Sequence, residues 1–501
     1  MKRLTRRMAA TAMAAPLLLA CAVASGPAAS AATAYPPGGP DQTPVMGWSG
    51  WSFLRMGANT AQVEGEARAL VSTGLAAAGY QDVDIDDGWY QCPGPQGPNV
   101  DGNGRWVVNS ANYPGTGSEN GIAALASYVH HLGLKFGIYE TAGISSQAVA
   151  ENTPILGTSD TADQIATNKS QNNYNCGGMD QINYNAPGAQ AYVNSVVDEL
   201  ASWGVDYIKL DGITDSNGPD IKAWQAAIHQ SGRSMVLDTT EGSFTTKLAP
   251  TLTKYSNQWE FAPDIEINGP DEGSADSCNS APFTGCLSVF PLTSYDHWSD
   301  RFADVAQWQP YGGPGGFNDY DSIEVGDGSA DSGMSLAASE TQLSLWALGS
   351  APLILGGDLT SAVTNAYGTS AGLTAQDLKM LTNRQVIGVD QDSIDASRVA
   401  NVGTPGPAAG SQVFAKRERS GDAVVGLFNT TTTLSSAPST ISTTAAAIGL
   451  PADPHGYLVQ DLWGQQSVAA GGTTFRISSA GRIQATVPAE GVALFRVTPL
   501  G

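Results

Sequence analysis

The sequence has few charged residues, few cysteines and few histidines. Charged residues make up only 14% of its 501 residues, with 47 acids against 24 bases. The five cysteines form no Cys-x-x-Cys pair and the five histidines form no cluster, which argues against a zinc site. A formal net charge of −23 repels phosphates, so we expect no nucleic-acid partner. No stretch after residue 30 is long and apolar enough to cross a membrane.

Residues 1–31 have the composition of a secretion signal. They begin with basic residues, continue with an apolar stretch and end in small residues, which is the order found in cleavable signal peptides. We expect cleavage after Ala31 and a secreted, extracellular protein with no membrane segment in its mature form. "TRRM" is a weaker match to a twin-arginine signal, and "LLAC" is a weaker match to a lipoprotein signal.

Four cysteines remain once Cys21 leaves with the signal, and an exported protein can oxidise them. Cys278 and Cys286 would close a short loop, which leaves Cys92 to pair with Cys176. Four cysteines allow three pairings, so the other connectivities stay open.

Strand-like and helix-like stretches alternate between about residues 44 and 390. Eight segments have strand character, at 45–51, 80–90, 134–141, 206–213, 234–241, 256–262, 315–323 and 351–359. Helix-like segments separate most of them, and the one at 189–204 has an apolar stripe at helical spacing, which indicates core packing. This alternation predicts an α/β fold, a (β/α)8 TIM barrel, which we expect over residues 32–394.

The character of the chain changes after about residue 395. Helical periodicity stops, and short strand-like segments alternate with turn residues. This pattern predicts a C-terminal antiparallel all-β sandwich domain over residues 395–501. Within the barrel, residues 143–186 and 268–288 look like insertions at strand ends, where barrel enzymes vary their loops.

Carboxylates and aromatic residues recur where the predicted barrel strands end. A TIM barrel builds its active site at these ends, and so many like charges close together need a function, although an isolated acid is more often a helix cap. Carboxylates accept hydrogen bonds from sugar hydroxyls, and cleavage of a glycosidic bond takes two carboxyl groups. Metal binding is a competing use, but hard-cation loops have tighter spacing, so we predict no metal and no cofactor.

Lys209 and Asp211 project from the same face of one predicted strand, because strand side chains alternate. Lys209 would keep Asp211 ionised and donate a hydrogen bond to a substrate hydroxyl. An ionised aspartate with a partner acid is what a glycosidase needs as its nucleophile. A purely structural ion pair is the alternative.

Several long motifs resemble those of glycoside hydrolase family 27, the α-galactosidases of clan D. "TPVMGWSGWSF" is similar to the family's "PPMGWNSWN", "AAGYQDVDIDDGW" to "AGYxYVNIDDCW", "WGVDYIKLDGI" to "WGVDYLKYDNC", and "GGPGGFNDYDSIEVG" to "AGPGGWNDPDMLEVG". The similarity runs in order from about Thr43 to Asp392. It implies a retaining exo-glycosidase that hydrolyses terminal α-D-galactosides of an oligo- or polysaccharide by double displacement, without a cofactor.

The resemblance also implies roles for single residues. Asp211 would be the nucleophile, and Asp264 in "WEFAPDIEI" would be the acid/base. Asp86 and Asp87 would hold the O6 and O4 hydroxyls of the sugar. The other substrate-binding positions would be Trp48, Tyr139, Lys209, Glu241 and Asp321.

One departure from the family lies in the predicted site. Glu260 stands where the family has an arginine that contacts the 2-hydroxyl. We place Glu260 among the substrate-binding residues, where its negative charge would help to keep Asp264 protonated. Related members act on β-L-arabinopyranosides or on isomaltose units of dextran, which are the alternative substrates, but the pair Asp86–Asp87 favours galactose because a pentose lacks O6.

Two further alternatives stay open. The chain could be an inactive carbohydrate-binding barrel, although intact Asp211 and Asp264 argue against this. Asp296 and Asp300 in "YDHWSD" are rivals of Asp264 as the acid/base, but "DHW" resembles a later family motif that begins a helix, so we expect Asp296 to cap that helix. A retaining mechanism predicts that the carboxyl groups of Asp211 and Asp264 lie about 5–5.5 Å apart.

Overall fold

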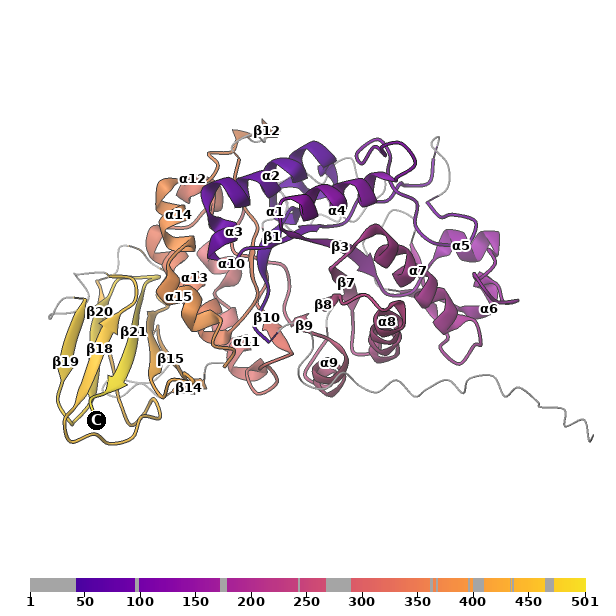
Figure 1. The fold of residues 1–501 in the computed structure, drawn as a ribbon. Helices are drawn as coiled ribbons and strands as arrows, with labels where there is room; N and C mark the ends of the chain where they lie inside the picture. The colour runs from indigo at the N-terminus through magenta and orange to yellow at the C-terminus, as the bar shows by residue number, and fades with distance from the viewer. Residues whose placement is uncertain are drawn as a thin grey trace, which may run out of the picture. The chain divides into compact units, whose positions relative to one another are not determined.

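Eight parallel strands, all predicted from the sequence, form one curled sheet (Figure 1). The computed structural model describes residues 42–501 except 95–98, 172–177, 242–243, 267–289, 361–363, 366–367, 395–396, 400–409, 433, 435–436 and 465–472. In spatial order the strands are β10 (Phe317–Asp319), β9 (Gln258–Glu260), β8 (Val236–Glu241), β7 (Tyr207–Ile213), β3 (Lys135–Thr141), β2 (Asp82–Ile85), β1 (Met46–Ser49) and β11 (Leu353–Leu355).

The sheet closes on itself through a short contact. Ile323, just after β10, forms a parallel bridge with Leu355 of β11, and the Ile323 amide donates to the Ile354 carbonyl at 2.7 Å. Together with the helices, this closure confirms the predicted (β/α)8 barrel.

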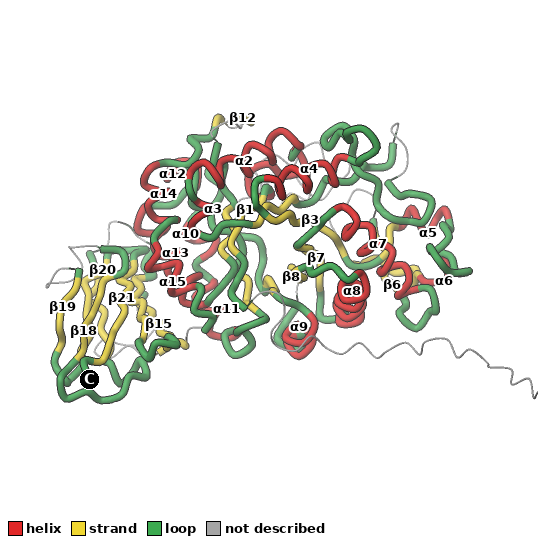
Figure 2. The backbone as a smooth tube through the Cα atoms, in the orientation of Figure 1, coloured by secondary structure: helices red, strands yellow, loops and turns green. Residues whose placement is uncertain are grey.

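Helices cover the outside of the barrel strands (Figure 2). On the predicted stripe of α7, Tyr192 and Leu200 are buried while Val196 and Trp203 are half-buried. The barrel helices are α1 (Trp51–Leu54), α2 (Thr60–Thr73), α3 (Leu75–Ala78), α4 (Gly121–His131), α7 (Ala189–Trp203), α8 (Gly218–Ser231), α9 (Ala249–Tyr255), α10 (Tyr295–Trp298), α11 (Arg301–Trp308), α12 (Gly328–Ser332), α13 (Leu336–Gly349), α14 (Ala375–Leu381) and α15 (Arg384–Asp390).

The first predicted insertion carries its own small sheet, of β4 (Ile144–Ser145), β6 (Met179–Ile182) and β5 (Ala166–Gln171), with α5 (Ser146–Glu151) and α6 (Ala162–Ile165) beside it. The second insertion, with Cys278 and Cys286, lies outside the described residues, and so do the predicted signal and Cys176. Cys92 is disulfide-bonded. Its pairing with Cys176 therefore stays a prediction.

The C-terminal part is antiparallel and folds as the predicted sandwich. One sheet has the order β14 (Ser397–Val399), β15 (Ser411–Arg417), β16 (Ala423–Asn429), β21 (Val492–Pro499), β18 (Tyr457–Asp461) and β19 (Thr474–Ile477). The other pairs β17 (Ser439–Thr444) with β20 (Arg482–Val487). A separate hairpin pairs β12 (Thr364–Asn365) with β13 (Gly368–Thr369).

The sandwich shares its core with the barrel. The Phe302 ring of α11 lies 5.1 Å from the Phe428 ring of β16, measured between centroids. The buried Lys416 ammonium donates to the Ala347 carbonyl of α13 at 3.1 Å. Among the described residues, no helix has both the length and the apolar character to cross a bilayer.

Candidate active site

A cavity opens at the C-terminal ends of the barrel strands and reaches down into the barrel. The space between its walls, including the open mouth, is about 560 Å³. Acids dominate its lining, and Lys209 is the one basic residue among the lining residues that the structure describes. The lining acids are Asp84, Asp86, Asp238, Glu260, Asp264, Glu266, Asp319 and Asp321.

Strand β7 places Lys209 and Asp211 on one face, as the alternation predicted. The two side chains, however, have different partners. The Lys209 ammonium binds Asp86 of β2 at 2.8 Å, while Asp211 accepts hydrogen bonds from the Tyr139 hydroxyl at 3.0 Å and the Thr240 hydroxyl at 2.9 Å. The ion pair therefore joins β7 to the residue that follows β2, on the other side of β3, and leaves Asp211 held by neutral donors.

Asp211 is buried, with 9% of its surface exposed. Burial raises the pKa of Asp211 above the ordinary aspartate value, and the charge of Lys209 works in the opposite direction. The charge of Lys209 therefore favours the ionised form of Asp211, as predicted. Burial has the larger effect, however, so the pKa of Asp211 is raised overall. The bonds from Thr240 and the Gly212 amide also favour the charged form.

Asp86 and Asp87 end β2 and are both buried. Asp86 lines the cavity beside Lys209. Asp87 accepts hydrogen bonds from the Tyr90 hydroxyl at 2.5 Å and the Gly88 amide at 2.7 Å. Burial is the main cause that raises the pKa of Asp87 to about 7, and the Tyr90 bond opposes it.

Glu260, Asp264 and Asp321 converge on one wall of the cavity, where one carboxylate oxygen from each lies within 4.8 Å of the other two. The Asp321 carboxylate accepts a hydrogen bond from the Ile265 amide at 2.7 Å, which fastens the segment that carries Asp264. Asp321 has a left-handed backbone with φ of 78°, a conformation that costs energy and that clusters at functional sites. Three carboxylate oxygens this close together repel one another when ionised, so a proton or a positively charged group among them is favoured.

Desolvation by the surrounding protein and the charge of Glu266 raise the pKa of Asp264 to about 7. Asp264 keeps an exposed surface, so water screens both effects in part. The charge of Asp211 also raises the pKa of Asp264, while Lys209 and Arg55 lower it. The pKa values of Glu260 and Asp321 are raised as well, but Asp264 is the most exposed of the three, so it is the one that a leaving group can reach from the cavity mouth.

Sequence reasoning missed Glu266, which is buried two positions after Asp264. Its carboxylate accepts hydrogen bonds from the Ser52 hydroxyl at 2.6 Å and the Ser322 hydroxyl at 3.4 Å. The predicted helper Glu260 has its own pKa raised well above the ordinary value by burial and by the charges of Asp321 and Asp264. Among the neighbouring charges, that of Glu266 contributes most to the raised pKa of Asp264, while Glu260 lies beside Asp264 as predicted.

Several predicted residues lie elsewhere than expected. Trp48 is fully buried and its indole N–H donates to the Gly357 carbonyl at 3.0 Å, whereas Trp51 lines the cavity. Tyr139 is buried and reaches the site through its bond to Asp211. The structure places Glu241 at the end of β8 but does not describe its side chain.

The rival acids Asp296 and Asp300 are exposed, and neither lines the cavity. Asp296 lies in the first turn of α10, where Ser294 and not Asp296 occupies the cap position. The prediction that Asp296 caps this helix is therefore wrong by two positions. Asp300 contacts the guanidinium of Arg301 at 3.2 Å.

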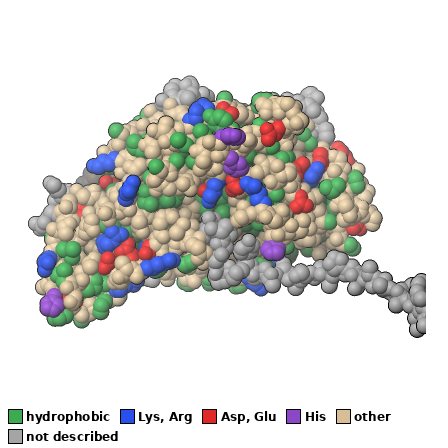
Figure 3. All heavy atoms as spheres, in the orientation of Figure 1, with side chains coloured by type: hydrophobic (Ala, Val, Ile, Leu, Met, Phe, Trp, Pro, Cys, Tyr) green, Lys and Arg blue, Asp and Glu red, His purple; other side chains and the backbone are tan. Residues whose placement is uncertain are grey.

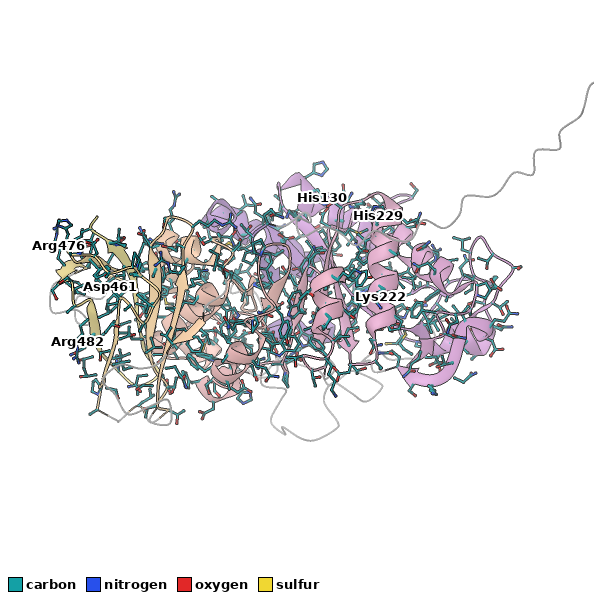
Figure 4. The ribbon with its side chains drawn as sticks, turned by 90° about the horizontal axis from the view of Figure 1, so that it is seen from below. His130, Lys222, His229, Asp461, Arg476 and Arg482 are labelled. Atoms are coloured by element: carbon teal, nitrogen blue, oxygen red, sulfur yellow. The ribbon has the colours of Figure 1, made fainter. Side chains whose placement is uncertain are left out.

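Histidines take no part in the lining of the cavity. His130 of α4 and His229 of α8 lie on outer helices of the barrel (Figure 4), and His130 pairs with Asp206 at 2.7 Å. On the face shown in Figure 3, described charged side chains of both signs are scattered and form no continuous basic stripe. Acid–base chemistry in the cavity therefore falls to the carboxyl groups.

Comparison with known proteins decides the family. The profile "Alpha galactosidase A" matches residues 43–160 and 291–392, and the profile "Alpha galactosidase C-terminal beta sandwich domain" matches residues 408–497. The α-galactosidase of Oryza sativa subsp. japonica is 30% identical over 464 residues, which cover 91% of this chain and 85% of that protein. The chain belongs to glycoside hydrolase family 27, the α-galactosidase family. It is therefore a glycoside hydrolase.

Further relatives and solved structures match over most of the chain. A probable α-galactosidase of Dictyostelium discoideum is 28% identical over 91% of this chain and 93% of its own length. Among solved structures, a family 27 β-L-arabinopyranosidase from Geobacillus stearothermophilus superimposes with a TM-score of 0.74 at 25% identity, over 92% of this chain and 97% of that chain. The α-galactosidase I of Mortierella vinacea, at 23% identity and a TM-score of 0.63 over 92% of this chain and 98% of that chain, shares the fold.

Proposed function

We propose that this family 27 enzyme hydrolyses terminal α-D-galactosides of oligo- or polysaccharides with retention of configuration, with Asp211 as nucleophile and Asp264 as acid/base. The observation that carries the proposal is the contrast between the two carboxyl groups. Burial raises the pKa of both groups, but Asp211 accepts hydrogen bonds from two hydroxyl groups, which favour its charged form, while the charge of Glu266 adds to desolvation and raises the pKa of Asp264 to about 7. One ionised and one protonated carboxyl group are what double displacement requires.

The reaction then runs in two balanced steps. An Asp211 oxygen attacks C1 of the sugar, the bond from C1 to the glycosidic oxygen breaks, and Asp264 gives its proton to that oxygen. In the second step Asp264 takes a proton from water, the water oxygen bonds to C1, and the ester bond to Asp211 breaks. Asp211 leaves as the carboxylate and Asp264 is protonated again, so both residues return to their starting states.

Galactose is the sugar we propose, because Asp86 lines the cavity and is held in place by Lys209. A carboxylate fixed in this way can accept a hydrogen bond from a 6-hydroxyl, which a pentose lacks. A β-L-arabinopyranoside is the second candidate, because the arabinopyranosidase from Geobacillus stearothermophilus superimposes with the higher TM-score of the two solved structures compared above.

Two assays test this function. The enzyme should hydrolyse an aryl α-D-galactoside faster than an aryl β-L-arabinopyranoside. Proton NMR should show the α-anomer of galactose as the first product. In Asp211→Asn, galactoside turnover should be lost because an amide cannot form the glycosyl ester, while the melting temperature stays near that of the parent. Preference for the pentoside would move the substrate to the second candidate, and a β-anomer as first product would refute double displacement.

We further propose that the enzyme is secreted after removal of residues 1–31. The order of basic, apolar and small residues supports this export. N-terminal sequencing of the protein from culture medium should begin at Ala32, and peptide mapping without reduction should find Cys92 joined to Cys176 and Cys278 joined to Cys286. An intact N-terminus, or cysteines paired differently, would contradict these two points separately.

A further inference from the structure

The wall formed by Glu260, Asp264 and Asp321 contains a buried acceptor without a donor. Glu260 ends β9, lines the cavity and has only 4% of its surface exposed. Its Oε1 atom accepts no hydrogen bond from the part of the chain that the structure describes. A buried polar atom without a partner costs about 1–3 kcal/mol, so this acceptor is suited to a donor that arrives with the ligand.

The surroundings of Glu260 favour a positively charged donor. Asp264 and Asp321 bring two more carboxylate oxygens to within 4.8 Å. Among the lining residues that the structure describes, Lys209 is the one base, and it is already paired with Asp86 at 2.8 Å. Within this described lining, the three acids have no second basic side chain to pair with.

The chemistry of the reaction indicates which substituent meets this wall. Asp264, as acid/base, must reach the glycosidic oxygen on C1. A carboxylate within 4.8 Å of Asp264 that faces the same sugar meets the atoms next to C1, which are the ring oxygen and the substituent on C2. The ring oxygen has no proton to donate, so the C2 substituent is the partner for Glu260.

We propose, resting on the function proposed above, that this site takes α-D-galactosides with a free amine on C2, that is, 2-amino-2-deoxy-α-D-galactosides. The ammonium group would donate hydrogen bonds to Glu260 Oε1 and to Asp321. Hydrogen bonds between an ammonium and a carboxylate are roughly twice as strong as those between neutral groups. A carboxylate beside the ammonium also offsets its repulsion of the positive charge that develops at C1 during cleavage.

A binding experiment separates this inference from the reaction itself. The catalytically inactive variant Asp211→Asn is used so that no turnover occurs. Calorimetry then measures its affinity for galactosamine, galactose and N-acetylgalactosamine at about pH 6, where the amine is charged. We expect galactosamine to bind at least about tenfold more tightly than galactose, which is a difference of about 1.4 kcal/mol. N-acetylgalactosamine should bind more weakly than galactosamine because the acetyl group removes the charge.

Substitutions in and near the wall of Glu260, Asp264 and Asp321 test whether Glu260 causes the preference for the amine. Adding Glu260→Gln should reduce the preference for the amine to less than about threefold, because the amide keeps the shape but cannot take up the negative charge that pairs with the ammonium. Glu324→Gln, which removes an acid outside the lining, should leave the preference in place. Equal or weaker binding of galactosamine, or an unchanged preference in Glu260→Gln, overturns the inference even if aryl α-galactosides are hydrolysed. Failure to hydrolyse aryl α-galactosides refutes the proposed function instead.

Discussion

The carboxyl groups of Asp211 and Asp264 differ because their neighbours differ. Asp211 receives hydroxyl donors from Tyr139 and Thr240, which stabilise its charged form. Asp264 lies two positions from the buried Glu266, whose charge opposes ionisation of Asp264. The roles that we propose for the pair therefore follow from contacts of single side chains.

Asp264→Ala should affect substrates according to their leaving groups. Hydrolysis of galactosides with poor leaving groups should fall about 10²–10⁴-fold, because their oxygen needs the proton. Activated aryl galactosides should lose much less, since their leaving groups depart without it. Azide should restore activity to Asp264→Ala by taking the place of water in the second step. Rescue of Asp296→Ala and not of Asp264→Ala would show that the acid/base is misassigned.

Glu266→Gln tests whether the charge of Glu266 raises the pKa of Asp264. The active form needs a protonated Asp264, so activity falls as pH rises through the pKa of Asp264, about 7. Removing the charge of Glu266 lowers that pKa and should move the alkaline limb of kcat/KM to lower pH by about half a unit or more. Asp296→Asn removes an exposed acid outside the lining and is the matched control. An alkaline limb that does not move in Glu266→Gln would mean that Glu266 does not tune Asp264.

At the scale of elements, close packing between β2 and β3 fixes their register. Gly137 of β3 pairs with Asp84 of β2, and a Cβ on Gly137 would lie 1.8 Å from Asp84 Oδ1. Gly137→Ala should therefore lower the free energy of unfolding by about 1–3 kcal/mol. Chemical denaturation measures this change. The double variant with Asp84→Ala should lose less than the sum of the two single changes, because the clash is then absent.

Gly388→Ala is the matched control for this prediction. Gly388 lies in the interior of α15, is exposed, and an added Cβ would meet nothing within 4 Å. The substitution should stabilise the protein by about 0.8–1 kcal/mol through helix propensity. Equal effects of Gly137→Ala and Gly388→Ala would contradict the packing described for β2 and β3.

The strands could be predicted from sequence because each combines apolar residues with acids or glycines at its ends. The threonine-rich segment at 429–444 shows no alternation with apolar residues, yet its last six residues form β17, an edge strand that pairs with β20. Threonine favours strands, but a run without alternation with apolar residues does not show which strand it will pair with. That information lies in β20, about forty residues further along the chain.

The sequence shows which residues lie at the strand ends that form the site, but it does not show which of their side chains contact one another. The pair of Lys209 with Asp86 joins strands far apart in sequence, and the alternation within one strand cannot reveal it. Glu266 is a single acid between two isoleucines, a pattern that carries no signal of its role beside Asp264. Trp48 ends a strand as expected, but its side chain turns into the core, so Trp51 of α1 lines the cavity instead.

At the scale of the whole molecule, buried acids should make stability depend on pH. Burial raises the pKa values of Asp84 and Asp238 in the barrel interior, and of Glu140 and Asp390 elsewhere, well above their ordinary values. Between the ordinary unfolded pKa of about 4 and these raised values, the folded state binds more protons than the unfolded state. Stability must then fall as pH rises through this interval.

We therefore expect a higher melting temperature at about pH 5 than at about pH 8, and scanning fluorimetry can measure it. Asp238→Asn should make the decrease shallower, because the amide oxygen can still accept the Tyr207 hydroxyl, now 2.6 Å from the Asp238 carboxylate. A melting temperature that rises from pH 5 to pH 8 would contradict the proton binding described here.

The central claim is that Asp211 forms a covalent bond to galactose during turnover. A 5-fluoro-α-D-galactosyl fluoride should trap this intermediate, because the ring fluorine slows the second step more than it slows formation of the ester. Mass spectrometry of the digested protein should find one fluorogalactosyl group, on the Asp211 side chain in "YIKLDGI", and no label in Asp211→Asn. A label on another carboxylate, or turnover that leaves the wild-type enzyme unlabelled and fully active, would contradict the account.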